Sequence, residues 1–333
     1  MSQMQIMDNH GRPIEYVRLA VTDRCNLRCF YCMPEEGIKY MARTALLTYE
    51  EMERLVSILA GMGVHKVRIT GGEPFLRKQL PDFMQRLLAI PGIDQLNLTT
   101  NGVLTKAYIP QLIDMGIHSI NLSLDTLDRQ RFFDMTRRDE LPKVLDCLEA
   151  LIEAGIKTKI NAVIMEGKNT QDIVPLAELA ATRPIEVRFI EEMPFNGSGG
   201  HEEIKTWNYR QILDELTGKY PDLQKISSEK GATATRYTIP GFVGKVGIIP
   251  AFSRTFCGAC NRIRITPKGT LKTCLYDNGV LDLRELIRGG ASDEEVQAAF
   301  LKAFKSRAKD GYEAEKGRGD AAPIQESMST IGG

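Results

Sequence analysis

The sequence between residues 16 and 32 is YVRLAVTDRCNLRCFYC, a short strand-like run followed by three cysteines within eight positions. Free cysteine packs as a small hydrophobic residue, so packing alone gives no reason to place Cys25, Cys29 and Cys32 so close together. Zinc normally takes four Cys or His ligands, and no fourth one lies nearby in the sequence. The loop is therefore predicted to bind a four-iron cluster through three thiolates, which leaves one iron open.

Around this loop, short strand-like runs alternate with helix-like stretches, which is the pattern of a parallel βα architecture. The six candidate strands are Tyr16–Val21, Lys66–Thr70, Gln95–Thr99, Ser119–Leu124, Thr158–Ile164 and Ile185–Ile190. Thr48 and Glu51 form a capping box at the start of one helix. Because eight units close a barrel, six units predict an open, partial (βα)6 barrel of the TIM type. A doubly wound sheet is the alternative.

Length and composition fit a globular protein of about two domains. We expect an N-terminal extension over residues 1–13, a barrel over 14–230 and a C-terminal region over 231–333. Lys plus Arg and Asp plus Glu both number 43, so the overall charge attracts neither nucleic acid nor membrane. The polar N-terminus has no apolar signal segment, and seven cysteines suit a reducing compartment, so we expect a cytoplasmic protein.

One face of the six candidate strands is polar or charged, and alternate residues of a barrel strand face inward. The residues on that face are Arg18, Lys66, Arg68, Thr70, Asn97, Thr99, Asn121, Ser123, Lys159, Asn161, Glu186 and Arg188. The alternative is a face that meets solvent, which a parallel sheet covered by helices rarely allows. Buried cations without enough carboxylates are costly unless a polyanion enters. The pattern therefore predicts a phosphorylated substrate, and a nucleoside triphosphate fits.

A second group of cysteines, Cys257, Cys260 and Cys274, lies near the C-terminus. Three thiolates would again leave one iron of a cluster open, while a zinc knuckle with a fourth ligand from elsewhere is the alternative. Arg262 and Arg264 alternate on a strand beside these cysteines and could bind phosphates through their forked donors.

Several motifs carry a family resemblance. The C-x3-C-x2-C spacing with an aromatic residue before the third cysteine resembles the signature of radical S-adenosylmethionine (SAM) enzymes. Gly71-Gly72-Glu73-Pro74, directly after a candidate strand, resembles their GGEP motif. The stretches 21–34 and 257–264 and the ending 328–333 are similar to the branch of these enzymes that serves molybdenum cofactor synthesis.

This resemblance implies cofactors and site residues. It implies two [4Fe-4S] clusters and SAM, with Cys25, Cys29 and Cys32 on the first cluster and Cys257, Cys260 and Cys274 on the second. The SAM-binding residues would be Tyr31, Gly72, Ser123 and Met193. The GTP-binding residues would be Arg18, Arg68, Thr99, Lys159, Arg262 and Arg264. No side chain is expected as an acid or base, and the candidate supporting residues are Arg188, Gly332 and Gly333.

The resemblance also implies a reaction and partners. SAM cleaved by one electron would give a deoxyadenosyl radical, which takes hydrogen from the ribose C3′ of GTP. The resulting carbon radical would then attack C8 of the guanine, giving 3′,8-cyclo-7,8-dihydro-GTP. A flavodoxin or ferredoxin would supply the electron, a cyclic pyranopterin monophosphate synthase would act next, and a homodimer is a possible assembly. The alternatives are a peptide-modifying radical SAM enzyme and a ferredoxin-like electron carrier.

Overall fold

Six parallel strands form the centre of the molecule. This computed structural model describes residues 5–195, 207–228, 231–318 and 326–332. The central strands are β1 (Tyr16–Ala20), β2 (Lys66–Thr70), β3 (Gln95–Thr100), β4 (Ser119–Ser123), β5 (Thr158–Ile164) and β6 (Glu186–Glu191). Each pairs in parallel with the next one in sequence, from β1 to β6. The six predicted strands are therefore present, with ends that differ by no more than one residue.

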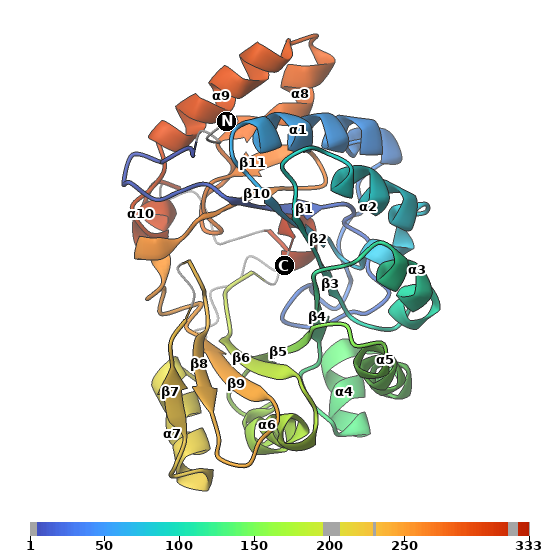
Figure 1. Cartoon of the computed structure of the whole chain (residues 1–333), viewed down its shortest axis with the longest axis vertical. Helices are drawn as coiled ribbons and strands as arrows, with labels where there is room; N and C mark the ends of the chain where they lie inside the picture. The colour runs from blue at the N-terminus through green and yellow to red at the C-terminus, as the bar shows by residue number, and fades with distance from the viewer. Residues whose placement is uncertain (1–4, 196–206, 229–230, 319–325, 333) are drawn as a thin grey trace.

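The helices between these strands cover one face of the sheet, on the outside of its curve (Figure 1). They are α1 (Tyr49–Gly61), α2 (Leu80–Leu88), α3 (Ile109–Asp114), α4 (Arg129–Thr136), α5 (Leu141–Glu153) and α6 (Ile173–Thr182). Val17 and Ile69, which point outward from β1 and β2, are fully buried in one core with Leu55 of α1. A doubly wound sheet has helices on both faces, so this arrangement confirms the partial barrel.

Strands from the C-terminal part extend both edges of the six-stranded sheet. On one side, β10 (Arg262–Ile265) pairs in parallel with β1 and is followed by β11 (Thr270–Lys272) and β12 (Leu281–Asp282). On the other side, β9 (Lys245–Ile249) pairs in parallel with β6 and is followed by β8 (Thr235–Thr238) and β7 (Gln224–Ile226). Hydrogen-bonded pairing thus continues across residue 230, and the division into domains at that point stays a prediction.

The remaining helices complete the described chain. They are α7 (Tyr209–Lys219), α8 (Leu283–Arg288), α9 (Asp293–Lys305), α10 (Gly311–Lys316) and α11 (Met328–Ile331). The predicted capping box is present at α1, where the Thr48 hydroxyl accepts from the Glu51 N–H and the Glu51 carboxylate accepts from the Thr48 N–H.

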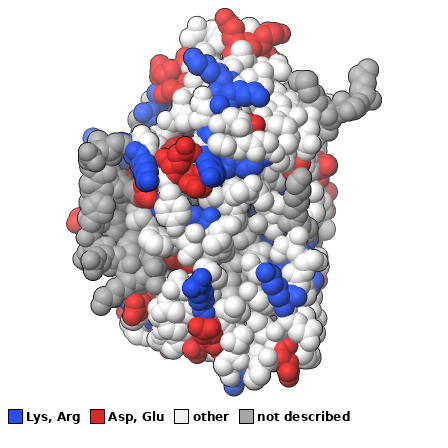
Figure 2. Space-filling view, turned by 90° about the vertical axis from the view of Figure 1, so that its left-hand side faces the viewer, with Lys and Arg blue, Asp and Glu red and all other residues white. Residues whose placement is uncertain are grey.

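The surface carries both signs of charge. On the face shown in Figure 2, basic and acidic residues are interspersed and neither sign dominates. This agrees with a net charge of zero, so any strong positive potential must come from a local site. Within the described residues, no helix has the length and apolar composition needed to span a membrane.

Candidate active site

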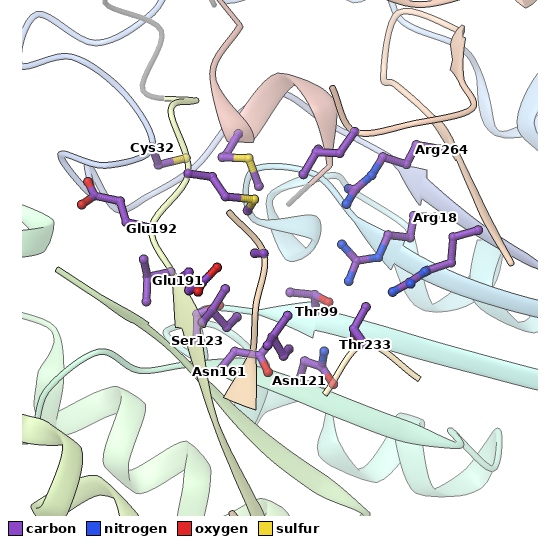
Figure 3. A pocket seen from close by; sticks show the side chains of 18 of the residues that line it. Arg18, Cys32, Thr99, Asn121, Ser123, Asn161, Glu191, Glu192, Thr233 and Arg264 are labelled. Atoms are coloured by element: carbon purple, nitrogen blue, oxygen red, sulfur yellow. The ribbon is translucent and has the colours of Figure 1, made fainter. Parts of the chain in front are cut away.

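A cavity of about 310 Å³ lies inside the curve of the sheet. The predicted residues on its wall are Arg18, Cys25, Cys29, Tyr31, Cys32, Gly72, Thr99, Ser123, Arg188, Met193, Cys257, Cys260, Arg262, Arg264 and Cys274. Cys32 lies on one side of the cavity, while Arg18 and Arg264 lie together on the other (Figure 3). Both groups of cysteines, 225 residues apart at their nearest members, therefore meet at one cavity. Of the other predicted residues, Arg68, Lys159 and Gly332 are not on this wall, and Gly333 lies outside the described residues.

The first cysteine loop follows directly from β1 and presents three half-buried thiols. Burial and then the nearby Glu73 carboxylate raise the pKa of Cys25 to about 12, and burial raises the pKa of Cys32 to about 11. Burial, followed by the charge of Asp125, also raises the pKa of Cys29. The thiols thus keep their protons until a positively charged group binds and replaces them. Three convergent thiols at a cavity fit an iron–sulfur cluster.

Two glycines let the end of β2 lie against this loop. A Cβ atom at Gly72 would be 2.2 Å from the Arg24 carbonyl oxygen, and one at Gly71 would be 2.5 Å from the Thr22 carbonyl oxygen. The Gly72 N–H donates to the Thr22 oxygen at 2.9 Å. A side chain at either position would push the loops apart, so the Gly-Gly pair is required by close packing. Gly72 itself faces the cavity.

The Glu73 carboxylate joins the carboxyl ends of β2 and β3. It is fully buried and accepts from the Thr100 hydroxyl at 2.9 Å and the Asn101 N–H at 2.8 Å. Burial raises its pKa to about 7. The Asn101 amide in turn donates to the Cys25 sulfur at 3.6 Å. Glu73 therefore supports the first cysteine loop through the neighbouring strand end.

The second group of cysteines is brought together by β10 and β11. Cys257 begins a single helical turn, Cys260 lies just before β10, and Cys274 follows β11. Burial opposes ionisation of Cys260, but the charges of Arg262 and Arg307 outweigh burial and lower its pKa to about 6. Among the described residues, no three Cys, His, Asp or Glu side chains are arranged to hold a single metal ion. A four-iron cluster is larger than an ion, and its ligand sulfurs stand farther apart.

Polar atoms without a partner line the floor of the cavity. In the described part of the chain, Thr99 Oγ1, Asn121 Oδ1, Asn161 Oδ1 and Arg262 Nη2 are buried and make no hydrogen bond. Figure 3 shows the first three beneath the arginines. Buried polar groups are normally satisfied, so these atoms indicate a polar ligand. The sequence placed Asn121 and Asn161 on the inner face but did not distinguish them from neighbours such as Asn97, which bonds within the protein.

The cationic residues extend beyond the cavity wall. Burial, followed by the charges of Arg188 and Arg68, lowers the pKa of Lys159 to about 7. Burial, followed by Arg18 and Arg262, lowers the pKa of Arg264 to about 9. These shifts show that the cations repel one another in a poorly solvated place. A bound polyanion would relieve this repulsion.

Tyr16 is a member of this cationic cluster that the sequence analysis missed. Its buried hydroxyl accepts from Arg68 Nε at 2.6 Å, while Arg68 Nη1 donates to the Leu98 carbonyl at 2.9 Å. Burial opposes its ionisation, but Arg68 and then Arg18 lower the pKa of Tyr16 to about 7. The available signal was that Tyr16 stands two residues before Arg18 and so shares its inward face.

The C-terminal segment reaches into the site (Figure 1). The Ser327 hydroxyl donates to the Cys32 carbonyl at 2.5 Å, and Arg264 Nη1 donates to the Gly332 carbonyl at 2.5 Å. Gly332 has a φ of +78°, and a Cβ atom there would be 2.7 Å from Thr70 Oγ1. Both facts require glycine at this position.

Comparison with known proteins places the chain in a family. The Radical SAM superfamily matches residues 19–180, and Molybdenum Cofactor Synthesis C matches residues 185–313. The crystal structure of Streptococcus suis SuiB bound to S-adenosylmethionine has the same fold, with a TM-score of 0.60 and 14% identity over 93% of this chain and 69% of that chain. The fold and these matches define a radical SAM protein, a class that uses a [4Fe-4S] cluster and SAM.

Relatives define the family more closely. The protein named GTP 3′,8-cyclase from Chlorobaculum tepidum is 37% identical over 99% of this chain and 98% of its own length, and the one from Pelotomaculum thermopropionicum is 38% identical over 90% and 93%. Molybdenum cofactor biosynthesis protein 1 of Mus musculus is 40% identical over 87% of this chain. The chain spans about half the length of such animal relatives, 46% for the mouse protein. The chain belongs to the GTP 3′,8-cyclase family of molybdenum cofactor biosynthesis proteins.

The Tyr16 and Lys159 pKa values give a pH prediction for anion binding. As pH rises from 6 to 8, Tyr16 gains negative charge and Lys159 loses positive charge, so both changes weaken attraction for a polyanion. The Tyr16→Phe variant should lose less affinity for inorganic tripolyphosphate over this range than the unchanged protein. The loss of affinity between pH 6 and pH 8 should differ between the two proteins by up to about tenfold for each unit by which the bound anion raises the pKa of Tyr16. Calorimetric titration at pH 6, 7 and 8 measures it.

Tyr220→Phe is the control, because Tyr220 contacts only exposed Glu178 through its hydroxyl. At each pH, the affinity of a variant is divided by that of the unchanged protein. This ratio removes the effect of tripolyphosphate ionisation, which is the same for every protein. Equal pH trends for all three proteins would show that Tyr16 does not titrate in this range.

Proposed function

We propose that this chain is a GTP 3′,8-cyclase, which converts GTP to (8S)-3′,8-cyclo-7,8-dihydroguanosine 5′-triphosphate in the first step of molybdenum cofactor biosynthesis. The observation that carries the proposal is that two cysteine triplets and a cluster of cations meet at one cavity. The bacterial relatives named GTP 3′,8-cyclase support it, because they align with nearly the whole chain.

The end of the cavity that carries Cys25, Cys29 and Cys32 would bind a [4Fe-4S] cluster through these three residues. The same end would bind SAM. The SAM contacts in this proposal are Tyr31, Gly72, Ser123 and Met193, all on the cavity wall. When bound, the cluster and SAM together supply a carbon-centred radical that abstracts hydrogen. Asp125 holds Tyr31 in place, because its carboxylate accepts a hydrogen bond from the Tyr31 hydroxyl at 2.7 Å. The other carboxylate oxygen accepts from the Val163 N–H at 2.8 Å.

The other end would bind a second [4Fe-4S] cluster through Cys257, Cys260 and Cys274, and its open iron would offer a position for a ligand atom of the guanine. The GTP contacts in this proposal are Arg18, Arg68, Thr99, Lys159, Arg262 and Arg264. Arginine forks suit phosphate oxygens, so the cationic residues would hold the triphosphate. Fixing both ends of the nucleotide would place its ribose toward SAM and bring C3′ close to C8.

No side chain needs to act as an acid or base in this proposal. Arg188 lies on the cavity wall and forms a 2.6 Å ion pair with Glu186, which fixes its guanidinium. Gly332, whose carbonyl accepts from Arg264, and Gly333 are the candidate supporting residues of the tail in this proposal.

The partners in this proposal follow from the reaction. A reductant of the flavodoxin or ferredoxin type would provide the electron, and a cyclic pyranopterin monophosphate synthase would consume the product. The protein would work in the cytoplasm, without nucleic acid or membrane, and could form a homodimer.

An anaerobic assay tests the proposal. Reconstituted protein is incubated with SAM, dithionite and, separately, GTP, ATP and a peptide, and both deoxyadenosine and modified substrate are measured. We expect deoxyadenosine and cyclised product with GTP. Modification of the peptide alone would favour a peptide-modifying enzyme, and no deoxyadenosine with any of the three would favour an electron carrier.

The two cysteine groups should separate in function. Cys29→Ser should abolish SAM cleavage, whereas Cys274→Ser should leave some cleavage but no cyclised product, because the first group serves SAM and the second serves GTP. Iron content and deoxyadenosine are measured on the same samples. Cys147→Ser is the control, since this buried cysteine lies in α5 within the helical core. Loss of SAM cleavage in Cys274→Ser but not in Cys29→Ser would reverse the assignment.

The tail should depend on a glycine at residue 332. An L-residue with this φ costs about 1–2 kcal/mol, so Gly332→Ala should lower the docked population of the tail by about tenfold and reduce cyclisation. Iron content should not change. Gly317→Ala is the control, because its Cβ would make only ordinary contacts at 3.5 Å. Equal turnover in the two variants would make residues 332 and 333 an ordinary terminus.

A further inference from the structure

A buried group of three charged residues lies behind the second cysteine group. Asp8 Oδ2 accepts from Arg12 Nε at 2.7 Å and from Arg307 Nη1 at 3.2 Å. The exposed fractions of the three side chains are 0%, 6% and 2%. Two cations share one carboxylate, so this group carries a net positive charge in a place where unbalanced charge is costly. Nothing in the proposed reaction uses these residues.

Arg307 contacts both segments that carry the second cysteine group. Its Nη2 donates to the Cys260 sulfur at 3.2 Å and to the Arg262 carbonyl at 2.8 Å. Its Nη1 donates to the Cys260 carbonyl at 2.9 Å, and its Nε donates to the carbonyl of Thr273, the neighbour of Cys274, at 3.0 Å. With the Asp8 contact, all five N–H donors of this guanidinium are accounted for.

Arg12 holds the remaining cysteine from the same side. Its Nη1 donates to the Cys257 carbonyl at 3.1 Å and to the Lys309 carbonyl at 2.6 Å, and its Nη2 donates to the Ala308 carbonyl at 2.8 Å. The N-terminal segment and the loop after α9 are thereby joined around the second cysteine group. The segment before β1, expected only as an extension, is part of the site.

The first cysteine group has different surroundings. Burial and then the carboxylates of Glu73 and Asp125 raise the pKa values of Cys25 and Cys29, and Arg28 Nη1 donates to the Cys25 carbonyl at 2.5 Å. The neutral amide of Asn101 donates to Cys25 Sγ at 3.6 Å. Cys260 therefore lies next to two arginines, whereas Cys257 and Cys274 have the carboxylates of Asp310 and Asp277 nearby.

We propose that Arg307 is a positioning residue for the second cluster, which fixes the Cys260 thiolate and raises the reduction potential of that cluster. This inference rests on the proposed function, which supplies the second cluster. A hydrogen bond and a positive charge at a ligand sulfur favour the state with one more electron, because reduction adds negative charge to the cluster. The carboxylates near the first cluster act in the opposite sense. The electron comes from the external reductant in both cases.

The test measures the one-electron midpoint potentials of both clusters in the anaerobic, iron-loaded protein by a redox titration followed by electron paramagnetic resonance. The signal that changes when SAM is added is assigned to the first cluster. In Arg307→Gln, the reduction equilibrium of the second cluster should fall by about tenfold, a shift of about 59 mV to lower potential. The first cluster should not shift.

A second variant, Asp8→Asn, distinguishes a change of charge from a loosening of the segments that carry the second cysteine group. Removing this carboxylate leaves Arg307 and Arg12 less compensated, so the potential of the second cluster should rise, opposite to Arg307→Gln. Arg54→Gln is the matched control, since it removes one positive charge from an exposed pair with Asp293 at 2.7 Å. It should shift neither potential.

Shifts of opposite sign in the two variants support the inference. An unchanged second potential in Arg307→Gln, or the same direction of shift in both variants, overturns it. If Arg307→Gln does not retain the second cluster, the Asp8→Asn variant is sufficient. A rise in the potential of its second cluster supports the inference, and a fall or no change overturns it. An unchanged protein that holds only one cluster by iron and sulfide analysis would contradict the proposed function as well. Two clusters with unshifted potentials would contradict this inference alone.

Discussion

Repulsion among like charges buried inside one barrel is the constraint on which the rest of this structure depends. Arg264 and Lys159 both have lowered pKa values, caused first by burial and then by neighbouring arginines. Such a cluster is tolerable only where a polyanion binds part of the time. The unpartnered polar atoms of Thr99, Asn121 and Asn161 indicate that a polar ligand binds at the cavity floor. A bound polyanion would lower the free-energy cost of this site.

The two ends of the chain complete the site that the barrel begins. Asp8 and Arg12, from the N-terminal segment, hold the second cysteine group from behind. Ser327 and Gly332, from the C-terminal segment, contact the first cysteine loop and Arg264. Both segments therefore contact residues of the site from positions that are far away in the sequence. The two cysteine groups and Arg264 are therefore held by hydrogen bonds from the two ends of the chain.

Much of the fold could be predicted because its signals are local. In β1, Val17 points outward and Arg18 points inward, so the two faces of the strand can be recognised from a few neighbouring residues. A Gly-Gly pair similarly marks a turn. The cysteine groups were visible because metal ligands must come close together in the chain or in space. Asp125, Asp8 and Arg307 gave no comparable signal, since each contacts residues that are far away in the sequence.

The sequence by itself determined the six βα units, the inward face of each strand and both cysteine groups, because periodicity and spacing are properties of the chain alone. The tertiary structure alone decided that the two groups share one cavity, that Glu73 and Asp125 lie near the first and Arg307 near the second, and that Gly332 reaches Arg264. Charge acts through space, and its effect depends on burial and distance. Those quantities exist only after β10 has paired with β1 and the two ends of the chain have packed against the site.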